Sequence, residues 1–164
     1  MLILGLDPGS RVTGWGLVRQ EGAQAFHAAS GVLRLDERAD LATRLADLAV
    51  RLEALLREQR PDCAALEQIF SAKSARSALV LGHARGVILA TVKRAGLRVH
   101  EITPAQVKQA VTGSGRAGKD QVQRMVAVLL NYRAPMREDE SDALAVALAH
   151  GAAARLEAVS KMPE

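Results

Sequence analysis

The 164-residue chain has a single cysteine and an aromatic content of only 2%. One cysteine excludes an intramolecular disulfide, so Cys63 is best interpreted as a small core residue in a reducing compartment. Hydrophobic residues make up 49% of the chain but aromatic residues only 2%, so its core must be aliphatic. No apolar run is long enough to cross a bilayer, and the amino terminus lacks the pattern of a signal peptide. We therefore expect a cytoplasmic protein with one domain over residues 1–158 and a frayed tail at 159–164.

Charge is distributed unevenly along the chain. Residues 1–72 contain 8 Lys or Arg and 10 Asp or Glu, residues 73–137 contain 12 and 2, and residues 138–164 contain 2 and 6. Ordinary solvation of a surface gives no reason for so basic a middle segment, which raises self-repulsion. A polyanionic partner, nucleic acid above all, is favoured over a merely solvated surface.

Apolar periodicity predicts an α/β protein with a mixed five-stranded sheet flanked by helices. The expected strands are 2–6, 13–19, 25–35, 63–69 and 97–102. The expected helices are one of about five turns that starts at Leu41 and ends before Pro61, then 75–95, 104–111, 119–132 and one from about 139 toward 156. The first three strands should form an antiparallel meander. The fourth follows a helical crossover and should therefore run parallel to the first.

Four acidic residues stand at the ends of these apolar segments: Asp7, Glu67, Asp139 and Asp142. If the first and fourth strands are parallel neighbours, Asp7 and Glu67 share one end of the sheet, with backbones about 5 Å apart. Asp139 and Asp142 are three residues apart and so face one side of a helix's first turn. Clustered carboxylate oxygens suit Mg²⁺, and two such ions can activate water and stabilise the leaving oxygen in phosphodiester cleavage.

Each of these residues also has a plain structural interpretation. Asp139 and Asp142 could cap the last helix, since an Asp cap followed three residues later by an acid suits a helix's positive end. The sequence Asp7-Pro8-Gly9 could be only a tight turn. Glu67 is harder to explain in this way, because an acid that ends a buried strand needs a partner. All of these acids fall at compatible ends of the expected strands and helix, and this favours one shared site.

The segment from Gly113 to Lys119 matches the G-x-x-x-x-G-K pattern of a nucleotide phosphate loop. The next residue is Asp120 rather than Ser or Thr, and the preceding segment is helical rather than a strand. We therefore interpret it as a basic loop that meets phosphates through Arg116, Lys119 and backbone N–H groups.

Phe70 stands in polar surroundings and could either fold back into the core or stack on an unpaired base. The four histidines show no metal-ligand spacing. Among them His150 could at most assist Asp142 indirectly.

Several segments closely resemble the RuvC-type Holliday junction resolvases, in order over roughly residues 2–150. They are LGLDPGSRVTG at 4–14, LEQIF at 66–70 with Ala72 and Lys73, QVKQ at 106–109, and D-x-x-D-A-L-A from Asp139. The resemblance implies a ribonuclease H-like fold, a homodimer, and Mg²⁺- or Mn²⁺-dependent cutting of four-way DNA junctions, alongside branch-migration motor proteins.

The resemblance also implies roles for single residues. It assigns catalysis to the four acids, although some members have His at the position of Asp139. It places Lys108 and Lys119 near the DNA and the site, and Phe70 near the opened crossover. We count Lys73 and Arg116 among the DNA contacts as well.

The mechanism we expect is hydrolysis that leaves a 5′-phosphate and a 3′-hydroxyl. Asp7 would bridge two ions, and Glu67 and Asp142 would hold one each. Asp139 would complete the site or orient water, and Lys119 would neutralise charge on the phosphate. Two alternatives stay open from the residues: a non-catalytic, structure-selective DNA-binding module, and a nuclease for RNA–DNA hybrids or flaps.

Overall fold

The computed structural model describes residues 1–68 and 74–160, and these form a mixed sheet with helices on both faces. The strands are β1 (Leu2–Asp7), β2 (Val12–Glu21), β3 (Gln24–Arg34), β4 (Cys63–Glu67) and β5 (Arg98–Ile102). The helices are α1 (Leu41–Gln59), α2 (Ala75–Arg94), α3 (Pro104–Thr112), α4 (Lys119–Leu129) and α5 (Glu138–Ser160).

The sheet has the strand order β3-β2-β1-β4-β5, with β1 at its centre. The first three strands pair antiparallel as a meander, and β4 pairs parallel with both β1 and β5. The mixed five-stranded sheet expected from the sequence is therefore confirmed, including the parallel pairing that follows the helical crossover.

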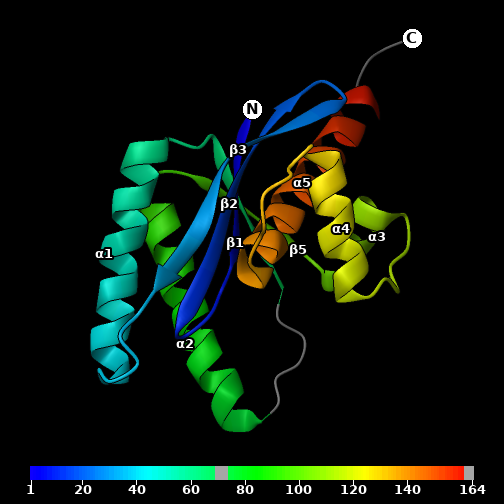
Figure 1. The fold of residues 1–164 in the computed structure, drawn as a ribbon. Coiled ribbons are helices and arrows are strands. Elements are labelled where there is room, and N and C mark those ends of the chain that lie inside the picture. Colours follow the sequence, from blue (N-terminus) through cyan, green and yellow to red (C-terminus); the bar gives the residue numbers. More distant parts are fainter. Residues whose placement is uncertain (69–73, 161–164) are drawn as a thin grey trace.

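Helices α1 and α2 cover one face of the sheet, and α3, α4 and α5 cover the other (Figure 1). The alternation of side chains along β1 explains how both faces are buried. Leu4 and Leu6 belong to the core shared with α1 and α2, whereas Ile3 belongs to the core shared with α5. Odd-numbered positions of β1 thus face α5, and Asp7 is one of them.

Helix α1 ends at Gln59, before Pro61 as expected from the sequence, where Arg60 adopts a left-handed conformation. Helix α4 ends at Leu129 rather than at 132, because Asn131 has a positive φ of 48°. Helix α5 runs on to Ser160, and residues 161–164 of the expected tail lie outside the described residues. None of the helices over 1–68 and 74–160 combines the length and apolarity needed to cross a bilayer.

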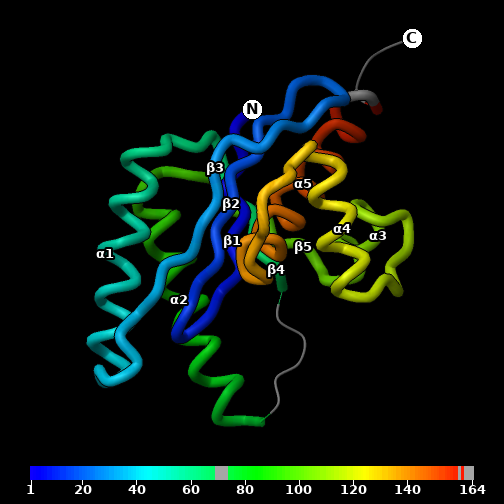
Figure 2. The backbone as a smooth tube through the Cα atoms, in the orientation of Figure 1, coloured from blue at the N-terminus to red at the C-terminus, as the bar shows by residue number. Residues whose placement is uncertain are grey.

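Helix α5 packs unusually close to the sheet because glycines lie beneath it. A Cβ atom at Gly5 would lie 1.9 Å from the Ala143 carbonyl oxygen, and one at Gly14 would lie 2.0 Å from that of Asp139. The backbone trace shows α5 beside β1 and β2 along this contact (Figure 2). Close approach at this point is possible only without side chains, and it fixes the amino-terminal end of α5 over the end of β1.

Candidate active site

Asp7 and Glu67 lie next to each other on one face of the sheet. The β1–β4 register pairs Leu6 with Leu66, so the following residues, Asp7 and Glu67, are neighbours across the parallel strands. In β4, Cys63 and Ala65 belong to the core beneath α5, and alternation places Glu67 on the same side. The sequence-based expectation that these two acids share one end of the sheet agrees with this geometry.

The amino-terminal end of α5 brings Asp142 and Asp139 close enough to Asp7 for their charges to raise its pKa. Gly14 is the register partner of Asp7, and the Asp139 carbonyl oxygen lies directly against it. The capping interpretation fails for these two acids, because a different residue forms the helix-end hydrogen bond. The backbone N–H of Arg137, just before the helix, donates to Glu140 Oε2 at 3.0 Å.

A pocket of about 240 Å³ contains three of the four predicted acids. Its lining combines carboxylates from β1, β4 and α5, two lysines and an apolar wall: Asp7, Glu67, Asp142, Lys108, Lys119, Pro104, Val107, Val122 and Ala145. Asp139 does not line this pocket within the described residues. Its charge nevertheless raises the pKa of Asp7 and of Asp142.

Crowding and burial oppose ionisation of these acids. Burial raises the pKa of Asp7 to about 7, with further contributions from Asp142, Glu67 and Asp139, while Lys119 acts in the opposite direction. Burial is also the largest cause of the raised pKa values of Glu67 and Asp142. A divalent cation would relieve this repulsion, since it favours the charged form of every carboxylate around it.

Lys119 supplies positive charge at the pocket from the first position of α4. Its ammonium group forms ion pairs with Glu138 and, at 3.5 Å, with Asp142 Oδ2. The hydrogen bond to Glu138 is the largest cause of its raised pKa, so Lys119 remains protonated at neutral pH. The sequence analysis did not identify Glu138. The sequence could have indicated this residue, because Glu138 stands just before Asp139 in the first turn of the same helix.

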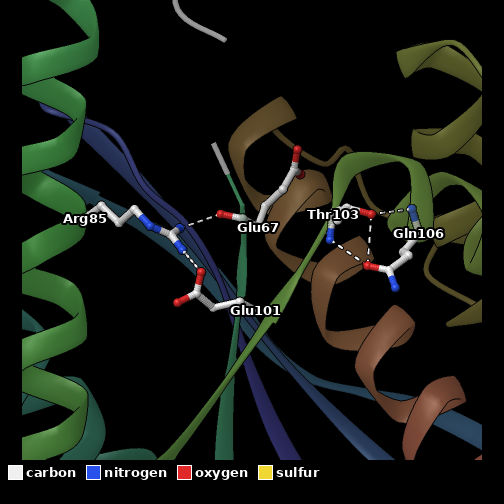
Figure 3. A network of polar contacts seen from close by, with 5 residues as sticks. All are labelled: Glu67, Arg85, Glu101, Thr103 and Gln106. Carbon is white, nitrogen blue, oxygen red and sulfur yellow. Dashed lines mark hydrogen bonds and ion pairs between the residues drawn. The ribbon is translucent and has the colours of Figure 1, made fainter. Parts of the chain in front are cut away.

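The end of β4 is held from the opposite face of the sheet by Arg85 of α2 (Figure 3). Arg85 Nη1 donates to the Glu67 carbonyl oxygen at 2.5 Å, and Nη2 forms an ion pair with Glu101 of β5. The Glu67 carboxylate points away from Arg85, toward the α5 side (Figure 3). This contact was not predicted from the sequence. The only feature that could have indicated it is a charged residue, Arg85, between the small residues Ala84 and Gly86 of the helix.

The segment between α3 and α4 is not a nucleotide phosphate loop. It follows helix α3 rather than a strand, as expected from the sequence. The Gln109 side chain holds it, accepting a hydrogen bond from Gly115 N–H at 3.1 Å and donating one to the Gly113 carbonyl at 3.0 Å. Arg116 is exposed on this loop and lies outside the lining of the pocket.

Three further expectations have different outcomes. Phe70 and Lys73 fall outside the described residues, so their predicted DNA contacts stay predictions. His150 does not assist Asp142. It lies farther along α5, stacked on His100 of β5 with ring centroids 3.9 Å apart.

The donor set at the pocket fits a hard divalent cation. Its anionic ligand atoms are carboxylate oxygens from Asp7, Glu67 and Asp142, the type that Mg²⁺ and Mn²⁺ prefer. These residues come from three separate elements, so their arrangement does not depend on one flexible loop. The two lysines beside them suit a phosphate substrate.

The chain is similar to known proteins over most of its length. The family model described as crossover junction endodeoxyribonuclease RuvC matches residues 3–150. RuvC of Citrifermentans bemidjiense is 45% identical over 161 residues, covering 98% of each chain. RuvC of Anaeromyxobacter sp. (strain K) is 51% identical over 150 residues, covering 92% of this chain and 80% of the relative.

The fold gives the same result. Thermus thermophilus RuvC in complex with a Holliday junction substrate matches with a TM-score of 0.90 at 33% identity, covering 96% of each chain. The ribonuclease H-like architecture expected from the sequence is thereby confirmed. The chain belongs to the RuvC family of crossover junction endodeoxyribonucleases.

Proposed function

We propose that this chain is a metal-dependent, structure-selective endonuclease that resolves four-way DNA (Holliday) junctions by paired symmetric nicks in homologous recombination and DNA repair. One observation carries the proposal. Carboxylates from β1, β4 and α5 converge in a single pocket with Lys108 and Lys119. Neither helix capping nor turn formation requires residues so distant in sequence to meet.

The metal ligands in this proposal are Asp7, Glu67 and Asp142, with Asp139 beside them. They would hold two Mg²⁺ or Mn²⁺ ions, with Asp7 as the central ligand, since the charges of all three other acids raise its pKa. When bound, the ions supply an activated water and offset negative charge on the phosphodiester.

The remaining chemistry belongs to side chains of the chain itself. Lys119 Nζ carries a permanent charge at the pocket and neutralises charge that develops on the phosphate. Lys108 contributes a second cation from α3. The products carry a 5′-phosphate and a 3′-hydroxyl, so the nicks can be ligated.

The basic segment 73–137 binds the DNA in this proposal. Lys108, Arg116 and Lys119 contact phosphates, Lys73 adds a further contact, and Phe70 stacks at the opened crossover. The solved Thermus thermophilus relative is described in complex with a Holliday junction substrate, which supports the same class of substrate for this chain.

Two copies of the chain act together in this proposal, since a two-fold dimer matches a two-fold junction and places two equivalent cuts. Helix α2 is the candidate contact, because a stripe of small residues along it is exposed: Ala78, Gly82, Gly86 and Ala90. The nuclease occupies one domain over residues 1–158. It works in the cytoplasm beside branch-migration motor proteins.

A synthetic four-way junction tests the activity directly. Incubated with Mg²⁺, the wild type should produce symmetric, ligatable nicks, and EDTA should abolish them. Asp7→Asn should abolish cutting while junction affinity survives, since the ligand is lost but the basic surface remains. Asp47→Asn is the matched control, because Asp47 is a surface acid on α1 paired with Arg51.

The alternatives give different results in the same assay. Retarded but intact DNA with the wild type in Mg²⁺ would indicate a binding module without catalysis. Loss of both cutting and binding in Asp7→Asn would mean that Asp7 is a structural acid. Competition with an RNA–DNA hybrid or a flap substrate distinguishes junction cutting from broader nuclease activity.

A further inference from the structure

A second group of metal-binding side chains lies outside the carboxylate pocket. The ligand atoms of Cys63, His100 and His150 all lie within 4.8 Å of one another. They come from β4, β5 and α5, and no two are close in sequence. Cys63 and His150 are buried, and His100 is half-buried.

Strand geometry explains why the three residues meet. Cys63 belongs to the core beneath α5, and Ala65 of the same core is the register partner of His100. Alternation therefore points Cys63 and His100 toward α5, which carries His150. Cys63 begins β4 and Glu67 ends it, so the group lies about 13 Å from the carboxylate pocket along the strand.

We propose that Cys63, His100 and His150 form a second metal site, selective for Zn²⁺ and similar borderline-soft cations. A thiolate and two imidazoles are typical zinc ligands, whereas the carboxylate pocket suits hard Mg²⁺. Three protein ligands leave a fourth coordination position. All three residues also help to line a neighbouring pocket of about 1120 Å³.

The group must move closer together, and one imidazole ring must turn, to hold the ion. Ligand atoms around tetrahedral Zn²⁺ lie about 3.6 Å apart, given metal–sulfur and metal–nitrogen distances of roughly 2.3 and 2.1 Å. The ligand atoms all lie within 4.8 Å of one another, so no pair needs to approach by more than about 1 Å. The imidazoles are stacked at 23°, so at least one ring must rotate about its Cβ–Cγ bond for both nitrogens to aim at one point.

Protonation is compatible with this assignment. Burial, followed by the neighbouring His100, lowers the pKa of His150 to about 4, so this imidazole is neutral at pH 7 and its lone pair is free. Burial raises the pKa of the Cys63 thiol, which is therefore protonated without metal. Binding breaks the S–H bond, forms a sulfur–metal bond and releases one proton to solvent.

The expected consequence is added stability rather than catalysis. An ion held by these residues would join β4, β5 and α5 at the end of the sheet opposite the carboxylate pocket. Because the ligands converge only in the folded chain, binding would favour folding.

Cobalt spectroscopy and thermal unfolding test the proposal on the full chain. One equivalent of Co²⁺ should give the wild type a thiolate-to-cobalt charge-transfer band, and Zn²⁺ should displace it. Asp7→Asn should keep the band, because it alters only the carboxylate pocket, and Cys63→Ser should lose it. One equivalent of Zn²⁺ should raise the melting temperature of Asp7→Asn, but not that of the double variant Asp7→Asn/Cys63→Ser, in which both sites are altered.

A second variant guards against misfolding of Cys63→Ser. His100→Ala removes a half-buried ligand and should weaken Zn²⁺ affinity at least tenfold in competition with a chromogenic chelator, with an unchanged circular dichroism spectrum. A wild type without the band, a band that persists in Cys63→Ser, or equal Zn²⁺ affinity in His100→Ala would each overturn the proposal.

Discussion

Asp7 is the residue at which folding and function conflict most directly. Burial and three neighbouring acids raise its pKa to about 7, against an ordinary value of 3.8. Each pKa unit corresponds to about 1.4 kcal/mol of preference for the protonated form. The fold tolerates this conflict because a divalent cation, in our proposal, reverses it.

This conflict predicts an unusual pH dependence for the metal-free protein. A raised carboxyl pKa means that the folded state holds a proton which the unfolded state releases near pH 3.8. The stability this contributes is present below pH 3.8 and is lost as pH rises toward about 7, by up to about 4 kcal/mol. Thermal unfolding in EDTA across this range should show the decline, and Asp7→Asn should show much less of it.

The control and the effect of metal sharpen this prediction. Asp47→Asn should follow the wild type, because Asp47 lies outside the pocket. Millimolar Mg²⁺ should raise the melting temperature of the wild type at pH 7 and raise that of Asp7→Asn much less. Equal shifts in both proteins would contradict a shared carboxylate site.

Arg85 is predicted to act as a positioning residue for Glu67. It holds the Glu67 carbonyl and pairs with Glu101, so Arg85→Gln should leave the end of β4 less constrained. We expect cutting to fall about 10- to 100-fold, with a higher Mg²⁺ concentration at half-maximal rate and unchanged junction affinity. Glu101→Gln keeps the bond to Glu67 and should have a smaller effect. An unchanged Mg²⁺ dependence in Arg85→Gln would exclude this role.

The position of helix α5 depends on glycines in the strands beneath it, because a side chain there would collide with the helix backbone. Gly14→Ala would place a Cβ atom 2.0 Å from the Asp139 carbonyl oxygen, and backbone atoms cannot yield as a side chain can. The first turn of α5 should shift, and with it Asp142. We expect a loss of stability of about 1–3 kcal/mol and a larger loss of junction cutting.

A matched glycine lies on α2. Gly82→Ala meets nothing within 4 Å and should be neutral or slightly stabilising, since alanine favours a helix interior. Thermal unfolding and a cutting assay on both variants check the comparison. A stable, fully active Gly14→Ala protein would show that α5 does not need this contact.

The whole molecule combines a pocket lined by three carboxylates with a basic segment over residues 73–137. Long-range attraction brings the DNA to the protein, while the acids repel phosphates unless cations intervene. Binding should therefore weaken steeply with salt, and cutting should require metal even where binding does not.

The exposed stripe on α2 predicts how two copies associate. Gly82→Arg should prevent close helix approach and convert a dimer to a monomer in light scattering, whereas Gly82→Ala should not. The added side chain meets no neighbour in the fold, so the monomer should stay folded. Paired symmetric cuts should then become single, uncoordinated nicks. A dimer that persists in Gly82→Arg would place the contact elsewhere.

Local pattern was enough to predict most of the elements and the two strand acids. Alternation places Asp7 on the face of Ile3 and Gly5, and a helical crossover makes β4 parallel to β1, so Asp7 and Glu67 had to be neighbours. These rules concern short-range backbone geometry, so they can be applied to a single sequence without an alignment.

Contacts between elements could not be predicted in the same way. The hold of Arg85 on Glu67, the pairing of Lys119 with Glu138, and the meeting of Cys63, His100 and His150 join residues 18 to 87 positions apart. No periodicity encodes such distances, because they depend on how closely α2 and α5 pack against the sheet. Residue type and strand alternation thus defined which carboxylates were available, and the docking of helices on two faces determined which groups they meet.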